Sequence, residues 1–276
     1  MFHIFRKPKL SKGIMTRKFQ CDREGLTIRG TEYRPEGENL PIAIVCHEFM
    51  MWSGTVRRYA GMLAQMGYAA YCFDFCGGSV MRGKSDGKTT DMTVLTEVKD
   101  LEAVIEYVLT LPYVNKEKIF LMGGSQGGFV SALVAAKNKY PIEKLCLFYP
   151  AFCLPDYMRE GNAIVKKFDP KNIPDIYPLG PMKLGRRYAD DIMEMDAYAE
   201  TKGYTGRVCI IHGTRDRIVD VSYAHRAVDA YKSTTPEHLD ENQRVQLHII
   251  EGGRHMFGRK YDKIATEKLK AFAEIN

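Results

Sequence analysis

The stretch Gly123-Gly124-Ser125-Gln126-Gly127-Gly128 decides the fold more than any other part of this chain. An apolar run at 119–122 precedes it, and an amphipathic run beginning at Phe129 follows it. This order predicts a buried strand, a tight turn and a helix. Passing from strand to helix in so few residues holds Ser125 in a strained, exposed conformation, and the glycines two positions either side make room for the backbone. The helix N-terminus offers free N–H groups to a negative charge that develops beside the serine. The stretch therefore predicts a nucleophilic serine at the end of a strand.

The spacing of two glycines around a serine is common, so the residues that follow must support it. An apolar run at 207–211 ends in a loop that carries Asp216, and a second run at 245–250 ends in a loop that carries His255. In a parallel sheet the loops at the carboxyl ends of the strands share one edge, where ligands bind. The order Ser, acid, His is the one that this turn motif requires. Ser125 would attack, His255 would take and return its proton, and Asp216 would orient His255.

Each assignment has a plainer alternative. Ser125 on its own fits an ordinary turn serine. Asp216 competes with Asp220, but Asp220 directly precedes a helical run and fits a helix cap better, so Asp216 is favoured. His47 and His212 also end strands, and structural hydrogen bonds explain them. The other histidines lie inside a strand or lack a partner pattern; they are His248, His3, His225 and His238.

The charge of the chain is concentrated at its start. The net charge is +6, and six cations precede the first acid, Asp22. The rest of the chain balances 34 basic with 34 acidic residues, so the excess is best explained as a solvated basic terminus. No nucleic-acid-binding module is recognisable. The six cations are Arg6, Lys7, Lys9, Lys12, Arg17 and Lys18.

Cysteine usage and hydropathy indicate a cytoplasmic protein. The N-terminus lacks the apolar stretch of a signal peptide, and no run is long enough to span a membrane. The chain has seven cysteines, and four of them fall in predicted strands, where burial as small apolar side chains explains them better than disulfides or metal ligands. We therefore expect no membrane partner, no metal and no cofactor. The four are Cys46, Cys72, Cys146 and Cys209.

Predicted strands and helices alternate along the chain, which is typical of an α/β fold with a mostly parallel sheet covered by helices on both faces. An antiparallel pair is expected within 13–34. Buried strands are expected near 42–46, 69–73, 119–122, 145–149, 208–211 and 245–250, and helices near 55–66, 92–111, 126–139, 222–231 and 261–275.

Residues 152–205 break this alternation. No strand is predicted there, prolines recur, and aromatic and methionine side chains are frequent. Because a structureless loop of this length is improbable in a compact domain, we predict a cap over the active site, with a packed structural excursion as the alternative. The predicted domains are a core of 1–151 and 206–276 and an inserted cap of 152–205. Such a cap would supply apolar walls for an acyl or aromatic group and limit water.

Several motifs together resemble those of the α/β-hydrolase superfamily, and more closely those of bacterial cinnamoyl (feruloyl) esterases. The resemblance covers the chain from about residue 20 onward. The motifs are the run at 45–49, Gly83-x-Ser85-Asp86-Gly87, the run at 92–101, the turn at 123–128, the run at 211–214 and the run at 251–255.

The resemblance implies an α/β-hydrolase fold and the catalytic residues Ser125, Asp216 and His255. It also implies an oxyanion hole formed by the backbone N–H groups of Phe49 and Gln126. In the similar esterases a cap Asp and a cap Tyr bind the ring hydroxyls of the substrate, and Asp156 and Tyr188 stand at the matching positions. One residue departs from the pattern, since Glu48 follows the first histidine where glycine is common. Glu48 could oppose negative charge at the oxyanion hole or point away to a structural partner.

We therefore expect a serine carboxylesterase that cleaves hydroxycinnamoyl esters through an acyl-enzyme intermediate. The partner would be a small aromatic or acyl ester, and a homodimer stays open. One alternative keeps the serine hydrolase but changes the substrate, to that of a broad-specificity or lipase-like carboxylesterase or an acyl-peptidase. A second alternative, from another class, is a non-catalytic small-molecule receptor on a hydrolase fold; a complete set of three catalytic residues argues against it.

Overall fold

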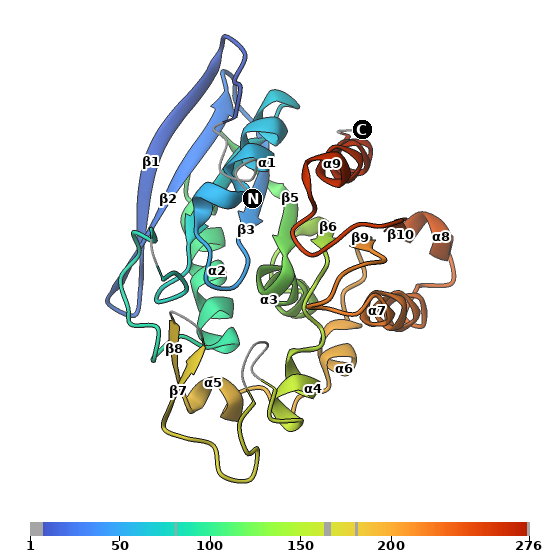
Figure 1. Ribbon diagram of the computed structural model, residues 1–276. Coiled ribbons are helices and arrows are strands. Elements are labelled where there is room, and N and C mark those ends of the chain that lie inside the picture. The colour runs from blue at the N-terminus through green and yellow to red at the C-terminus, as the bar shows by residue number, and fades with distance from the viewer. Residues whose placement is uncertain (1–7, 81, 163–166, 180–181, 275–276) are drawn as a thin grey trace.

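The protein is built around one eight-stranded sheet, seen in a computed structural model that describes residues 8–80, 82–162, 167–179 and 182–274 (Figure 1). The strand order is β1-β2-β4-β3-β5-β6-β9-β10. Strands β3, β4, β5, β6, β9 and β10 are parallel, and the hairpin β1–β2 joins antiparallel to β4. The expected antiparallel pair and parallel strands are therefore confirmed. The strands are β1 (Ile14–Arg23), β2 (Leu26–Pro35), β3 (Leu40–Cys46), β4 (Ala69–Asp74), β5 (Val114–Gly124), β6 (Ile142–Phe148), β9 (Arg207–Gly213) and β10 (Val245–Ile250).

Helices cover both faces of the sheet because alternate side chains of each buried strand point to opposite sides. In β3, Ile42 and Ile44 pack into one apolar cluster with α2, α3 and α7, while Ala43 and Val45 pack into another with α1 and α9. All five expected long helices are present, with ends that differ from prediction by a few residues. They are α1 (Ser53–Gln65), α2 (Val94–Leu109), α3 (Ser125–Ala136), α7 (Ser222–Lys232) and α9 (Arg259–Ala273), and a short α8 (Glu241–Arg244) precedes β10.

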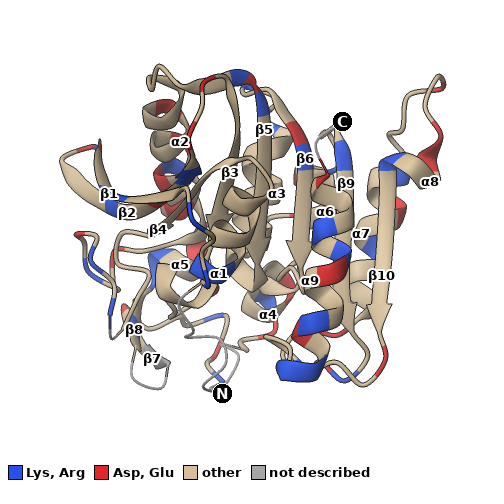
Figure 2. Cartoon of the chain, turned by 90° about the horizontal axis from the view of Figure 1, so that it is seen from above, with Lys and Arg blue, Asp and Glu red and all other residues tan. Residues whose placement is uncertain are grey.

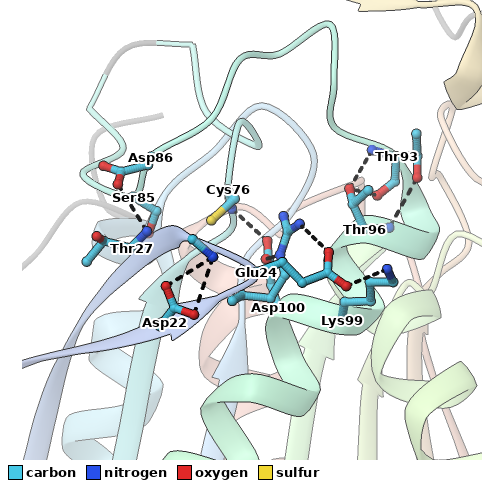
Figure 3. A network of polar contacts seen from close by, with 12 residues as sticks. Asp22, Glu24, Thr27, Cys76, Ser85, Asp86, Thr93, Thr96, Lys99 and Asp100 are labelled. Carbon is cyan, nitrogen blue, oxygen red and sulfur yellow. Dashed lines mark hydrogen bonds and ion pairs between the residues drawn. The ribbon is translucent and has the colours of Figure 1, made fainter.

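The hairpin β1–β2 is fastened to α2 by a buried ion pair. Arg23 Nε lies 2.6 Å from Asp100 Oδ1, and the other carboxylate oxygen of Asp100 accepts a hydrogen bond from Cys76 N at 2.7 Å. Figure 3 shows Asp100 between the turn at Cys76 and the side of Glu24 and Lys99. This contact joins the first hairpin to the loop after β4.

The segment 152–205 is more ordered than the sequence predicts. It contains a two-stranded antiparallel sheet, so the expectation that it lacks strands is wrong. The strands are four residues each, and Pro178 falls inside one, which hides the alternation that marks longer strands. The elements are α4 (Leu154–Arg159), β7 (Ile176–Leu179), β8 (Met182–Gly185), α5 (Arg187–Asp190) and α6 (Ala197–Thr201), and Figure 1 shows α4, α5, β7 and β8 together at one end of the molecule.

Two of the six basic residues near the N-terminus lie in a strand. Arg17 and Lys18 belong to β1, and Lys18 Nζ donates to Thr31 Oγ1 at 2.7 Å. Arg6 and Lys7 lie outside the described residues. Figure 2 shows Lys and Arg interspersed with Asp and Glu over the helices and at the starts of β5, β6 and β9. No helix in the described part of the chain is long and apolar enough to cross a membrane. All seven cysteines are free, and the four in predicted strands are buried as expected.

Candidate active site

Ser125 stands at the junction of β5 and α3 in a backbone conformation that side chains rarely adopt. Its φ is +51°, in the left-handed region. A Cβ at Gly123 would lie 2.2 Å from the carbonyl oxygen of Gly127, and a Cβ at Gly127 would lie 2.3 Å from that of His47. Both glycines are therefore required by close backbone approach, as the sequence predicts. The conformation of Ser125 is strained, as is common for residues at functional sites.

Three side chains from separate loops meet at this edge. His255 Nε2 lies 3.1 Å from Ser125 Oγ, and His255 Nδ1 lies 2.7 Å from Asp216 Oδ2. Ser125 begins α3 directly after β5, and the loops of Asp216 and His255 follow β9 and β10; these strands end at the same edge of the sheet because they are parallel. The structure thus brings together the three residues that the sequence predicts, within hydrogen-bonding distance of one another.

Asp216 is held ionised by its surroundings. Burial alone would raise the pKa of Asp216, but hydrogen bonds from His212 and His255 outweigh it and hold the pKa of this carboxyl below its usual range. Its other oxygen, Oδ1, accepts from the backbone N–H groups of Ile218 (2.9 Å) and Val219 (3.0 Å). An ionised Asp216 requires a proton on His255 Nδ1, which leaves a lone pair on Nε2 facing Ser125.

The other residues considered for these roles, Asp220, His47 and His212, have structural partners. Asp220 Oδ1 accepts from Ser222 N at 2.9 Å, next to the start of α7; the N-cap of this helix is Val221, one residue later than predicted. His47 accepts from Phe75 N at 3.1 Å through Nε2, so its Nδ1 donates to the Glu48 carbonyl at 2.8 Å. His212 Nε2 lies 3.0 Å from the Val219 carbonyl oxygen and 3.4 Å from Asp216 Oδ2. His212 therefore has the structural role expected of it and supports the loop that carries Asp216; its contact with Asp216 itself was not predicted.

Glu48 is turned toward structural partners. Tyr149 donates its hydroxyl to Glu48 Oε1 at 3.1 Å, and Thr55 donates to Oε2 at 3.1 Å. The ring of Tyr149 also lies 4.7 Å from that of His255, measured between centroids. Of the two roles left open for Glu48, the contacts support the structural one. From the loop after β3, Glu48 links Thr55 of α1 to Tyr149, whose ring lies beside His255.

The two candidate oxyanion residues, Phe49 and Gln126, belong to two different parts of the chain. Phe49 is in the loop that follows β3, and Gln126 is the second residue of α3, where backbone N–H groups have no partner within the helix. The side chain of Gln126 is buried; its Nε2 donates to Glu97 Oε2 at 2.9 Å, and its Oε1 accepts from the Tyr188 hydroxyl at 2.5 Å. Sequence reasoning missed the role of Glu97, although an acid at a core-facing position of an amphipathic helix is a sign of a buried polar contact.

The two candidate cap residues have different surroundings. Asp156 in α4 is partly exposed, and its Oδ2 accepts from the Tyr223 hydroxyl at 2.9 Å while Oδ1 pairs with Arg159. Tyr188 in α5 is 2% exposed, and its hydroxyl hydrogen is already given to Gln126. A direct contact between Tyr188 and a substrate hydroxyl would have to use the remaining lone pair of its oxygen.

Most of the chain matches a known protein family. A family model described as serine aminopeptidase, S33, matches residues 37–208. The chain belongs to this family of α/β-hydrolases. The match covers β3 to the start of β9 and so includes Phe49, the turn around Ser125 and the segment 152–205. It confirms the superfamily and the fold class that the motifs predict.

Solved structures resemble the whole α/β-hydrolase chain. Est1E from Butyrivibrio proteoclasticus with ferulic acid bound is 28% identical, has a TM-score of 0.80, and matches over 92% of this chain and 97% of its own. A second structure of Est1E is 26% identical with a TM-score of 0.76, over 95% and 97% of the two chains. A monoacylglycerol lipase from Paleococcus ferrophilus, 18% identical with a TM-score of 0.61 over 94% and 98%, shares the fold.

Proposed function

We propose that this α/β-hydrolase is a serine carboxylesterase that hydrolyses hydroxycinnamoyl esters through an acyl-enzyme intermediate. The observation that carries the reaction class is the chain of hydrogen bonds from Ser125 Oγ through His255 to Asp216. The aromatic acyl group rests on the likeness to Est1E, which was solved with ferulic acid bound.

In the first half of the reaction, Ser125 Oγ attacks the ester carbonyl while its proton passes to His255 Nε2. Asp216 stabilises the resulting imidazolium through Nδ1–H. The oxygen that becomes negative would accept from the N–H groups of Phe49 and Gln126, each worth about 3–4 kcal/mol of barrier in comparable sites. His255 then gives its proton to the departing alcohol, and the acyl group stays on Ser125.

In the second half, His255 takes a proton from water, whose oxygen attacks the acyl carbonyl. The bond from the acyl carbon to Ser125 Oγ then breaks, His255 returns the proton to Oγ, and the acid is released. The segment 152–205 would act as a cap that walls the acyl group, with the partly exposed Asp156 facing the ring hydroxyls.

The first test compares ethyl ferulate with p-nitrophenyl butyrate, each with and without a serine-directed fluorophosphonate. We expect inhibitor-sensitive hydrolysis of ethyl ferulate and loss of turnover by at least about 1,000-fold in Ser125→Ala, with the fold retained. Near wild-type turnover by Ser125→Ala would exclude Ser125 as the nucleophile.

The description of the family as aminopeptidases favours a second candidate, an acyl-peptidase, so an aminoacyl amide belongs in the same assay. Cleavage of butyrate alone would favour a broad-specificity or lipase-like esterase. Absence of cleavage and of labelling at Ser125 would favour a non-catalytic receptor.

A further inference from the structure

The side-chain amide of Gln126 joins three parts of the molecule. Its Nε2 donates to Glu97 of α2, and its Oε1 accepts from Tyr188 of α5. Gln126 itself is the second residue of α3. All three side chains are at most 2% exposed. Because a buried amide that loses a partner pays for its desolvation, this arrangement fixes the Gln126 side chain in one position.

Tyr188 touches both candidate oxyanion residues. Its hydroxyl bonds to the side chain of Gln126, and its ring centroid lies 6.0 Å from that of Phe49. The position of Tyr188 is itself fixed, because the cap is tied to the residues around the start of α2. Thr93 Oγ1 donates to Asp191 Oδ2 at 2.6 Å, and Thr89 Oγ1 donates to the carbonyl oxygen of Lys183 at 2.6 Å.

We propose that Glu97 and Tyr188 are positioning residues, which hold the two N–H donors of the oxyanion hole in place through the side chain of Gln126 and the ring of Phe49. The proposal rests on the function proposed above and gives Tyr188 a role different from binding a substrate hydroxyl. Oxyanion donors act only when they are held where charge develops, and a displacement of about 1 Å can cost roughly 100-fold in rate. A cap residue that sets their position makes the rate depend on the docking of the cap.

The protonation of Glu97 is compatible with this role. Burial raises the pKa of Glu97 well above its usual range, and the hydrogen bond from Gln126 opposes this only in part. A neutral carboxyl accepts from Gln126 without adding negative charge beside the oxyanion hole. The substitution Glu97→Gln keeps an oxygen that can accept the hydrogen bond from Gln126, so it should preserve the function of Glu97.

The experiment uses two ethyl esters that differ in their ring hydroxyls, ethyl ferulate and ethyl cinnamate, together with p-nitrophenyl butyrate. We expect Tyr188→Phe and Glu97→Leu to lower kcat roughly 10- to 100-fold on every ester that the wild type cleaves, with KM changed less than threefold. Glu97→Gln should keep kcat within about threefold. Tyr177→Phe is the matched control, since it removes the hydroxyl of another buried cap tyrosine that has no hydrogen-bond partner among the described residues.

Two results would overturn the proposal. If Tyr188→Phe raises KM for ethyl ferulate and leaves ethyl cinnamate unchanged, Tyr188 binds the ring hydroxyl instead. If Tyr188→Phe and Tyr177→Phe have equal kcat, the bond to Gln126 positions nothing. Tyr188→Phe keeps the test decisive if Glu97→Leu fails to fold, which circular dichroism would reveal.

The rate of Ser125 labelling by a fluorophosphonate separates failure of the positioning role from failure of the proposed substrate. Phosphonylation also builds negative charge on an oxygen at the hole, so we expect labelling to slow in Tyr188→Phe and not in Tyr177→Phe. This outcome supports the positioning role even if the wild type leaves ethyl ferulate intact. Equal labelling rates in the two variants would contradict it, and a wild type without any labelling would overturn the proposed function itself.

Discussion

Two buried acids on α2, three residues apart, have different kinds of partner. Asp100 is fully buried and faces the β1–β2 hairpin, where Arg23 Nε lies 2.6 Å away and Cys76 N donates to it, as Figure 3 shows for Asp100 and Cys76. Glu97 is 1% exposed and faces the candidate active site, where its partner is the neutral amide of Gln126. One acid is matched with a cation, and the other with an amide.

The difference follows from what each place requires. A buried carboxylate is costly unless a cation or several donors compensate it. Burial raises the pKa of Asp100, and the Arg23 guanidinium, which favours the charged form, opposes this shift only in part. For Glu97 burial dominates, so the uncharged form is favoured beside the candidate active site. The hairpin is attached through an ion pair, whereas the buried acid beside the candidate active site is bound by a neutral amide.

The largest effect is expected from Asp100→Asn. Arg23, whose side chain is only 11% exposed, would lose its buried partner and keep only the exposed Glu24 at 3.4 Å, and breaking a buried pair in this way costs roughly 3–5 kcal/mol of the free energy of unfolding. Urea denaturation measures this loss. The activity of the molecules that remain folded should stay within about threefold, because Asp100 does not contact the candidate site. A cost below about 1 kcal/mol would show that the pair contributes no more than a surface contact.

The corresponding substitution Glu97→Gln should change the stability of the protein by an amount that depends on pH. The pKa of Glu97 is raised in the folded state, so the native protein retains a proton that the unfolded chain releases above about pH 4.3. The stability of the wild type must then fall as the pH rises through this window, by at most about 1.4 kcal/mol per pH unit. Glu97→Gln cannot lose a proton, so its melting temperature relative to wild type should increase between pH 5 and pH 8. A constant difference would mean that Glu97 is already ionised in the folded protein.

These contrasts also define what the sequence could predict. The strand, turn and helix around Ser125 and the loops of Asp216 and His255 are local patterns, so the fold and the grouping of these residues followed from them. The partners of Glu97 and Asp100 did not, because they come from residues 23, 76 and 126, far away in the chain. The short strands β7 and β8 were missed because four residues with a proline carry too little alternation.

The smallest effect should come from Lys99, an exposed base that precedes Asp100 on α2. Lys99 Nζ lies 2.8 Å from Glu24 Oε1, as Figure 3 shows, but the two side chains are 52% and 60% exposed. Water and salt screen such a pair, and ordering two long side chains offsets its attraction. We expect Lys99→Met to leave the urea midpoint unchanged at 0.15 M and at about 0.5 M salt. A midpoint that falls in Lys99→Met only at low salt would mean that Glu24, Arg23, Asp100 and Lys99 act as one network. The attachment of the hairpin would then depend on surface charge as well as on the buried pair.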